Sequence, residues 1–207
     1  MNYNYLSIDC ESTGLDTAND QVLELAVVLD DLSQKVNRED LEDYLKQLPV
    51  FHCYIKHGRI LGNAYAISMH NRIFNIIAKE PAIEYFEDMK PGSVLLPEQV
   101  YQYLGVFLRD YGLLDQKTKV VGAGKNLAGF DYKILKTLPE FTESKAWSFH
   151  HRTIDPAMLY LQSTDNKPPS LNECLSRAGI NKTVDHTAVG DALDVIRCLK
   201  MSTKLYE

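Results

Sequence analysis

Two acidic residues, Asp9 and Glu11, lie at the end of an apolar segment near the start of the sequence. The alternating pattern predicts a β-strand over residues 3–11, which the turn residues 12–14 then end. Because side chains alternate along a strand, both carboxylates lie on one face and the apolar residues on the other. Two carboxylates this close repel each other unless a cation lies between them, and Mg²⁺ or Mn²⁺ prefers such oxygen ligands. The pair therefore indicates a metal site, with two ordinary acidic residues at a solvated strand end as the alternative.

Two further aspartates lie where a predicted helix presents apolar residues. Asp131 shares a helical face with leucine and isoleucine side chains, and Asp191 shares one with alanine, valine and cysteine. Burying a carboxylate on such a face is costly without a partner, although an incorrect helix phase would explain either residue alone. Asp194, in contrast, is expected to point outward. Together with Asp9 and Glu11, the two aspartates would make four inward carboxylates, which a pair of divalent cations would neutralise.

A histidine precedes the last of these acids. His186 lies five residues before Asp191, just ahead of a helix predicted over residues 188–201. From a loop at that position it can reach the site into which Asp191 points. A histidine can take a proton from an attacking water at neutral pH. A lone histidine is more often a surface residue, and the spacing to Asp191 is what favours a catalytic role.

Length and composition predict one well-buried domain over residues 1–207, because the chain is 45% hydrophobic and 24% charged. The net charge of −6 argues against a broad basic surface for duplex nucleic acid, but it leaves room for a short groove. The four cysteines lack metal-ligand spacing, so we expect reduced core thiols in a cytoplasmic protein. We expect no signal peptide and no membrane contact, because the chain enters a strand at once.

The elements that must position these residues can be read from periodicity and capping signals. The predicted strands are residues 3–11, 22–29, 51–55, 119–122 and 147–149. The predicted helices are residues 63–78, 98–108, about 126–138, one after the Asp155 cap, one from the Ser170 capping box, and 188–201. Residues 80–97 are predicted to form a loop. Early strands followed by alternating helices and short strands indicate a mixed α/β layer fold.

One segment interrupts this pattern. Residues 31–49 are predicted to be a helical insertion, with leucine and tyrosine residues at helical spacing and Pro49 as its end. We expect its helix to lie over a strand edge or beside the site. A surface helix without a function is the alternative, and the more common one.

With these residues in place, the chain resembles the DEDDh 3′-to-5′ exonuclease family, which includes ribonuclease T, oligoribonuclease and the proofreading subunit of bacterial DNA polymerase III. The resemblance rests on three ordered motifs at residues 8–14, 125–131 and 186–192, and covers nearly the whole chain. Glu24 and residues 152–155 are secondary matches. The departures are the insertion and an extra residue between Asn126 and Phe130, and they bear on substrate preference more than on chemistry.

The resemblance implies a ribonuclease H-like fold, with a mixed five-stranded sheet flanked by helices. It also implies two Mg²⁺ or Mn²⁺ ions held by Asp9, Glu11, Asp131 and Asp191, with His186 as general base. The implied reaction is metal-dependent hydrolysis of phosphodiester bonds at the 3′ ends of single-stranded DNA or RNA, releasing 5′-mononucleotides.

The resemblance further implies a set of substrate-binding residues that flank the terminal nucleotides, namely Cys10, Ser12, Thr13, Ile67, His70 and Asn126. Relatives are often dimers, so a homodimer is possible. A binding module that has lost its chemistry and a ribonuclease H-type endonuclease are the competing interpretations. The intact set of four acids and the histidine argues against the first, and the spacing from His186 to Asp191 argues against the second.

Overall fold

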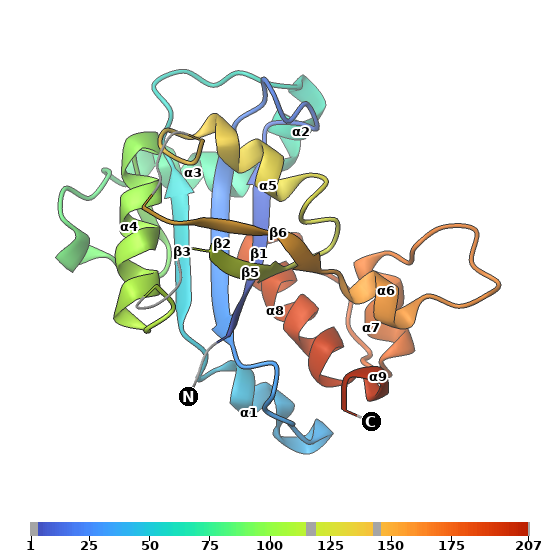
Figure 1. Cartoon of the computed structure of the whole chain (residues 1–207). Helices are drawn as coiled ribbons and strands as arrows, with labels where there is room; N and C mark the ends of the chain where they lie inside the picture. Colours follow the sequence, from blue (N-terminus) through green and yellow to red (C-terminus); the bar gives the residue numbers. More distant parts are fainter. Residues whose placement is uncertain (1–3, 115–118, 143–145, 207) are drawn as a thin grey trace.

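The computed structural model describes residues 4–114, 119–142 and 146–206 (Figure 1). Tyr3, which the sequence places in the first strand, lies outside the described residues. The described strands form one six-stranded sheet in the order β4-β3-β2-β1-β5-β6. They are β1 (Tyr5–Ser12), β2 (Val22–Asp30), β3 (Val50–Ile55), β4 (Ser93–Leu95), β5 (Lys119–Ala123) and β6 (Ser148–Ile154). β1 lies inside the sheet, antiparallel to β2 and parallel to β5.

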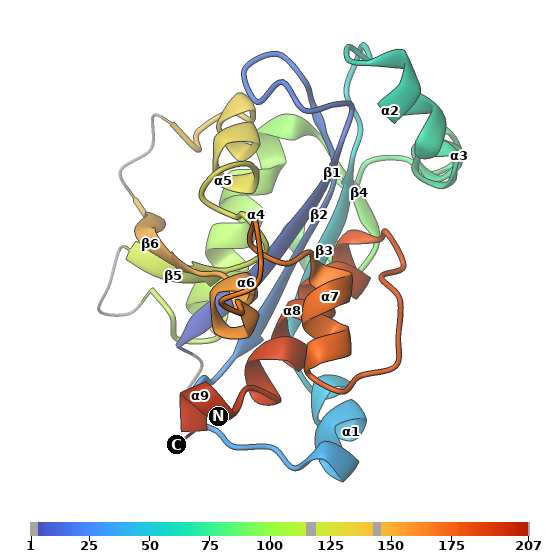
Figure 2. The same cartoon turned by 90° about the vertical axis from the view of Figure 1, so that its right-hand side faces the viewer.

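Helices cover both faces of this sheet, with α4 and α5 on one side and α8 on the other (Figure 2). The helical segments are η1 (Arg38–Asp40), α1 (Leu41–Leu45), α2 (Ala64–Met69), α3 (Asn71–Lys79), η2 (Phe86–Asp88), α4 (Pro97–Asp110), α5 (Asp131–Ile134), η3 (Leu135–Thr137), α6 (Pro156–Tyr160), α7 (Leu171–Arg177), α8 (Ala188–Lys200) and α9 (Thr203–Tyr206). Among the described residues, no helix is both long and apolar enough to cross a membrane.

The near-continuous apolar sequence of β2 follows from its burial on both faces. Every residue of β2 is buried. Leu25 and Val27 pack in the cluster that includes Leu104 of α4, whereas Ala26 and Val28 pack against α8. A strand covered on both sides cannot show polar alternation, so the absence of polar alternation correctly indicated a buried strand. The four cysteines are all free and buried, as expected.

Two predicted elements differ in the structure around residues 63–97. The predicted loop at 80–97 contains β4, which pairs in parallel with β3 through Cys53 and Ser93. A strand of three residues is too short to show alternation, which is why the sheet has one strand more than expected. The predicted helix at 63–78 is two helices, α2 and α3, which meet at His70. α3 buries Ile73 and Ile77, whereas α2 buries no residue.

Two further elements differ nearer the end of the chain. The predicted helix at 126–138 is a turn followed by short α5 and the 3₁₀-helix η3. Asn126 adopts φ 57°, a left-handed conformation that a continuous helix excludes. β6 begins close to the predicted strand at 147–149 but continues to Ile154. The Asp155 cap, the Ser170 capping box and the final helix are confirmed.

The insertion packs on the sheet face that α8 covers, rather than over a strand edge or beside the acidic residues. Leu41, Tyr44 and Leu45 are buried in a cluster with Ala192 and Ile196 of α8. In Figures 1 and 2, α1 lies at the end of the sheet opposite α2. The apolar stripe predicted in the sequence therefore corresponds to a buried face. The segment is part of the core rather than a surface helix.

A buried polar cluster fixes the insertion at this end. The carboxylate of Asp30 accepts hydrogen bonds from the hydroxyls of Tyr5 in β1 and Tyr44 in α1. Lys200 Nζ of α8 lies 3.0 Å from Asp30 Oδ2, and both side chains are fully buried. A buried charge pair with all its partners in place is costly to break. The cluster therefore joins β1, the insertion and α8 at one point.

Candidate active site

Three of the predicted acids converge at the end of β1 that lies near α2. Asp9, Glu11 and Asp191 each offer a carboxylate oxygen within 4.8 Å of the others. Asp9 and Glu11 share a face of β1, and Asp191 comes from the first turn of α8. α8 is fixed to β1 where Ser7 Oγ donates a hydrogen bond of 2.7 Å to the Ala192 carbonyl. The strand and helix thus bring together acids that are far apart in the sequence.

The fourth acid, Asp131, lies next to this group but is not part of it. Asp131 is buried at the first residue of α5, where its Oδ1 accepts a hydrogen bond of 3.1 Å from the Cys10 backbone N–H. Its negative charge raises the pKa of Asp9, so the two carboxylates interact. The structure therefore brings Asp131 to the site, with its side chain oriented by the backbone of β1.

Burial raises the pKa of all four acids, and the charges of other acids at the site raise those of Asp9 and Glu11 further. Burial, followed by the charges of Asp131 and Asp191, holds the pKa of Asp9 well above its ordinary value. Burial raises the pKa of Glu11 to about 7, that of Asp131 to about 7, and that of Asp191 to about 6. Carboxylates that favour protonation near neutral pH mark a site where a cation would relieve an unfavourable concentration of negative charge.

The residues fit a hard divalent cation. Asp191 Oδ1 is buried and has no hydrogen-bond partner among the described residues. A buried carboxylate oxygen without a partner needs an explanation, and a bound ion supplies one. The donor set consists of carboxylate oxygens, which suits Mg²⁺ or Mn²⁺ better than soft metals. Asp9, Glu11 and Asp191 are therefore able to hold a metal, with Asp131 alongside.

His186 lies in the loop before α8, and its side chain is exposed. Its backbone adopts φ 50°, and the next residue, Thr187, caps α8 by accepting a hydrogen bond from Gly190 N–H. The positive charge that His186 can carry lowers the pKa of Asp191, so the ring is close enough to sense that carboxylate. The predicted base is thus near the acids but at the solvent side of them.

A second histidine and a second glutamate lie next to Glu11. His70 Nε2 lies 3.8 Å from Glu11 Oε2. Glu24 is paired with Glu11 across β1 and β2, and its charge raises the pKa of Glu11. Glu24 is itself neutralised, because its carboxylate contacts His52 Nε2 at 2.8 Å and Arg72 Nη2 at 2.6 Å. Glu24 is therefore committed to a charge network rather than free to take a ligand.

A cleft of about 770 Å³ adjoins the acids. Its lining residues are Cys10, Glu11, Ser12, Gly14, Leu15, Asp16, Asp20, Asn63, Tyr65, Ala66, Met69, His70 and Phe130. Three of them expose large apolar side chains, with Leu15 at 86%, Tyr65 at 76% and Met69 at 59%. Exposed apolar side chains gathered at one cleft indicate a binding surface.

Close backbone packing fixes α2 beside the end of β1. The Asn63 backbone N–H donates to the Thr13 carbonyl at 2.8 Å, and the Asn63 side chain caps α2. Gly62 packs so tightly on Thr13 that an added Cβ would lie 2.3 Å from its side chain. Gly14 likewise leaves room for Asp20, since an added Cβ would lie 2.2 Å from its carboxylate. The turn after β1 therefore positions α2, and with it Tyr65.

The structure separates the predicted substrate-binding residues into two groups. Cys10, Ser12 and His70 line the cleft. Thr13, Ile67 and Asn126 do not: Thr13 is fully buried, Ile67 is half-buried, and the exposed Asn126 donates its backbone N–H to Asp155. A role for these three residues stays a prediction. The sequence analysis did not identify Tyr65, Met69 and Leu15 as cleft residues. The signal that could have found them is large apolar side chains on a helix and a turn that contribute little to the core.

The expectation that Asp194 points outward is wrong. Its side chain is fully buried, with Arg197 Nη1 at 2.7 Å from one carboxylate oxygen and Lys182 Nζ at 2.9 Å from the other. The helical phase places Asp194 toward the loop at 181–187, which covers α8 there. Sequence reasoning could not foresee a loop that supplies the neutralising lysine.

The sheet and its flanking helices define a ribonuclease H-like α/β fold, as the resemblance implied. No family model matches the chain, and no curated protein matches it significantly. Among solved structures, it is similar to the catalytic unit (protease and nuclease domain) of Neurospora crassa Pan2, with a TM-score of 0.54 and 12% identity over 98% of this chain and 27% of that one. It is also similar to the zinc-bound E. coli ExoI–ssDNA complex.

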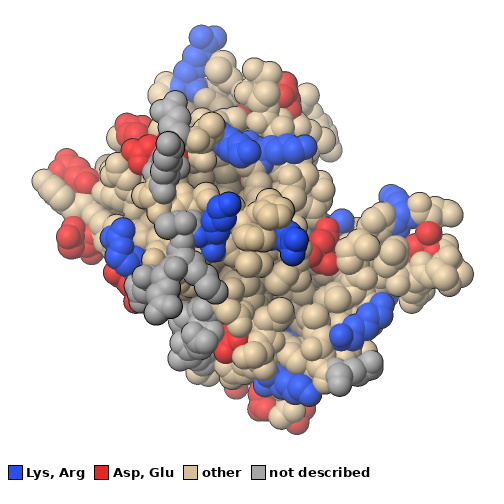
Figure 3. All heavy atoms as spheres, viewed as in Figure 1, with Lys and Arg blue, Asp and Glu red and all other residues tan. Residues whose placement is uncertain are grey.

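The match to the E. coli structure has a TM-score of 0.54 and 18% identity, over 99% of this chain and 41% of that one. This chain therefore spans less than half the length of either neighbour. At such identities the likeness establishes the shared fold. On the face seen in Figure 3, lysine and arginine side chains of the described residues are interspersed with acidic and uncharged surface.

Proposed function

We propose that the protein is a metal-dependent 3′-to-5′ exonuclease that hydrolyses phosphodiester bonds at single-stranded nucleic acid ends. The observation that carries the proposal is the convergence of Asp9, Glu11 and Asp191, with an unpartnered Asp191 oxygen, beside an apolar cleft. The ribonuclease H-like fold and its likeness to solved nuclease structures support it. The ordered sequence motifs at residues 8–14, 125–131 and 186–192 support assignment to the DEDDh exonucleases in particular.

In this proposal Asp9, Glu11, Asp131 and Asp191 hold two Mg²⁺ or Mn²⁺ ions. When bound, such ions supply positive charge that offsets the carboxylates and the charge developing on the scissile phosphate. His186 takes the proton from the attacking water as that water adds to phosphorus. The bond from phosphorus to the 3′ oxygen of the preceding nucleotide breaks, which releases a 5′-mononucleotide and leaves a new 3′ hydroxyl.

The cleft supports single-stranded rather than paired substrate. Tyr65, Met69 and Leu15 present exposed apolar surface beside Glu11. Unpaired bases stack on such side chains with little regard to sequence, whereas paired bases have no free faces to offer. The terminal nucleotide would then lie between this surface and the acids. A homodimer is a further prediction from the resemblance, and a cytoplasmic location is one from the free cysteines. The oligomeric state is measurable by light scattering.

The experiment that tests this function uses matched DNA and RNA oligonucleotides, labelled at the 3′ or the 5′ end, with Mg²⁺, with Mn²⁺ or with chelator. We expect a ladder of shortened 5′-labelled products and immediate release of the 3′ label as a mononucleotide, in the presence of metal. Internal fragments from both labels would instead indicate an endonuclease. Binding without any cleavage in either metal would indicate a module that has lost its chemistry. Either outcome overturns the proposal.

A further inference from the structure

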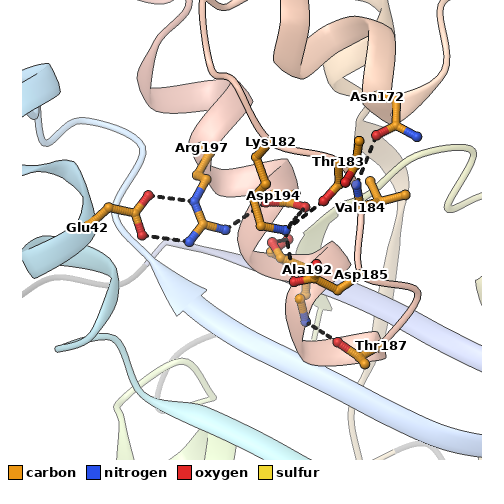
Figure 4. A network of polar contacts seen from close by, with 12 residues as sticks. Glu42, Asn172, Lys182, Thr183, Val184, Asp185, Thr187, Ala192, Asp194 and Arg197 are labelled. Carbon is orange, nitrogen blue, oxygen red and sulfur yellow. Dashed lines mark hydrogen bonds and ion pairs between the residues drawn. The ribbon is translucent and has the colours of Figure 1, made fainter.

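A chain of ion pairs of alternating charge runs from the insertion to the loop that carries His186 (Figure 4). Arg197 of α8 donates hydrogen bonds from Nε and Nη2 to the two carboxylate oxygens of Glu42 in α1, each at 2.8 Å. Arg197 in turn lies 2.7 Å from Asp194, and Asp194 lies 2.9 Å from Lys182 in the loop. Lys182 then contacts Asp185 at 3.0 Å, the residue directly before His186.

The middle of this chain is buried, which separates it from ordinary surface pairs. Asp194 has no exposed side chain, whereas Arg197 is 10% and Lys182 28% exposed. Each oxygen of Asp194 has its own cationic partner, so the buried carboxylate is fully compensated. Removing one partner leaves a buried charge unpaired, which is far more costly than losing an exposed pair. The loop is therefore held to α8 by an interaction that resists opening.

Other contacts hold the same loop at both sides. Arg38 of η1, also in the insertion, donates to the Ala178 carbonyl at 2.7 Å and to the Gly179 carbonyl at 3.0 Å, where the chain leaves α7. Val184 N–H donates to the Asn172 side chain at 2.9 Å. His186 itself has φ 50°, which is uncommon for a residue other than glycine. Such a conformation persists when its surroundings hold it.

We propose that the insertion, through Arg38 and through the ion pairs from Glu42 to Lys182, holds the loop that places His186 over the acidic site. These are positioning residues, since none of them lines the cleft or belongs to the acidic group, although Asp194 and Lys182 act on Asp191 through their charges. The inference rests on the proposed function, in which His186 is the general base. A base must lie within hydrogen-bond reach of the water it deprotonates, and a displacement of about 1 Å can cost on the order of 100-fold in rate.

The kinetic test compares Lys182→Met with Lys182→Arg. We expect Lys182→Met to lower kcat at least about tenfold with little change in KM, because the base is misplaced while the cleft is intact. Lys182→Arg, which can still bridge two carboxylates, should recover most of the loss. A rise in KM with unchanged kcat would show that Lys182 binds substrate phosphate, and an unchanged kcat and KM would show that the loop needs no such support. Either result overturns the inference.

A matched control separates positioning from general stability. Arg177, the last residue of α7, makes a comparable half-buried pair with Asp165 at 2.5 Å, and its side chain bonds to Asp165 and the Tyr160 carbonyl rather than to residues 181–187. Arg177→Met should lower the melting temperature without lowering kcat in the folded protein. If both variants lost kcat in proportion to stability, the ion pairs would be structural only. Asp185→Asn, at the exposed end of the chain, gives a milder variant that leaves Asp194 paired and should lower kcat in the same direction.

A second readout does not depend on turnover. Hydrogen exchange of the backbone amides at residues 183–187 reports directly on how firmly the loop is held. Faster exchange there in Lys182→Met and Arg38→Met, but not in Arg177→Met, is expected. Unchanged exchange would contradict the inference even if the wild-type protein hydrolysed nothing. A wild-type protein without hydrolysis but with the expected exchange would instead defeat the proposed function alone.

Discussion

The four acids at the site repel one another, and this repulsion has a measurable cost in the metal-free protein. Asp191→Asn keeps the shape of the side chain and removes one negative charge. We expect hydrolysis to be abolished, whereas the melting temperature in chelator should hold or rise, because burial, followed by the charge of Asp194, raises the pKa of Asp191 to about 6. Turnover assays and thermal unfolding in chelator measure the two effects.

Asp165→Asn provides the contrast for this experiment. Hydrogen bonds from Arg177 lower the pKa of Asp165 to about 2, so this carboxylate is stabilising at neutral pH. Its loss should lower the melting temperature and leave hydrolysis intact. An Asp191→Asn protein that still turned over substrate, or that melted earlier than wild type in chelator, would contradict the assignment of Asp191 to a metal site.

His186→Ala separates proton transfer from metal binding. The exposed histidine supplies a proton acceptor and is not one of the three residues that gather their oxygens within 4.8 Å. We expect kcat to fall on the order of 100- to 10,000-fold, with Mn²⁺ affinity largely retained. Calorimetric titration with Mn²⁺ and single-turnover kinetics test this. A loss of affinity as large as that of Asp9→Asn would assign His186 to the metal instead.

At the scale of residues, the sequence indicated the acids but not their neighbours. Asp9 and Glu11 are predictable because strand alternation is a local rule. Asp191 is predictable because apolar residues recur around it at helical spacing over several turns of α8. Asp194 is not, since its burial depends on Lys182, a residue brought in by a separate loop. Long-range charge partners leave no local pattern in the sequence.

At the scale of elements, α2 buries no residue and instead presents the exposed side chains of Tyr65 and Met69 to the cleft. Tyr65→Ala and Met69→Ala should leave the melting temperature nearly unchanged. Tyr65→Ala should weaken binding of single-stranded oligonucleotides by about 1–3 kcal/mol if a base stacks on the ring, and Met69→Ala should weaken it by less, because Met69 has no aromatic face. Fluorescence anisotropy in chelator measures binding without cleavage.

Tyr85→Ala is the matched control, because Tyr85 is 64% exposed but does not line the cleft. Equal loss of affinity in Tyr85→Ala would indicate general contact rather than a stacking surface. No loss in Tyr65→Ala or Met69→Ala would remove the cleft from the proposed function.

Elements were predictable in proportion to their length and regularity. α8 and β2, of 13 and 9 residues, are confirmed with nearly their predicted bounds. β4 was missed because three residues carry no periodicity. The turn predicted at residues 123–126 continues to residue 130, because the left-handed backbone of Asn126 interrupts a pattern that otherwise reads as helical. Short elements take their conformation from tertiary contacts rather than from their own sequence.

At the scale of the whole molecule, the raised pKa values predict how stability depends on pH. Free carboxyls of these types titrate at 3.8 and 4.5, whereas Glu11 and Asp131 in the folded protein titrate at about 7. Between these values the folded state binds more protons than the unfolded state, so the free energy of unfolding falls as pH rises. The contribution of the site is fully present below about pH 4 and lost by about pH 7.

Thermal unfolding of the metal-free protein across this range measures that decline. Because ions compete with protons for carboxylates, stabilisation by Mn²⁺ should be larger at about pH 8 than at about pH 5. The Asp9→Asn, Asp191→Asn double variant should show a shallower pH dependence and little response to Mn²⁺. A wild-type protein whose stability rose steadily from pH 4 to 7 would show that these carboxylates are not buried together as described.

The bond between Ser7 of β1 and Ala192 of α8 joins positions 185 residues apart. A ribosome makes β1 before α8, so a growing polypeptide contains Asp9 and Glu11 long before Asp191 has been added. The acidic centre therefore cannot form until residues 188–200 have left the exit tunnel.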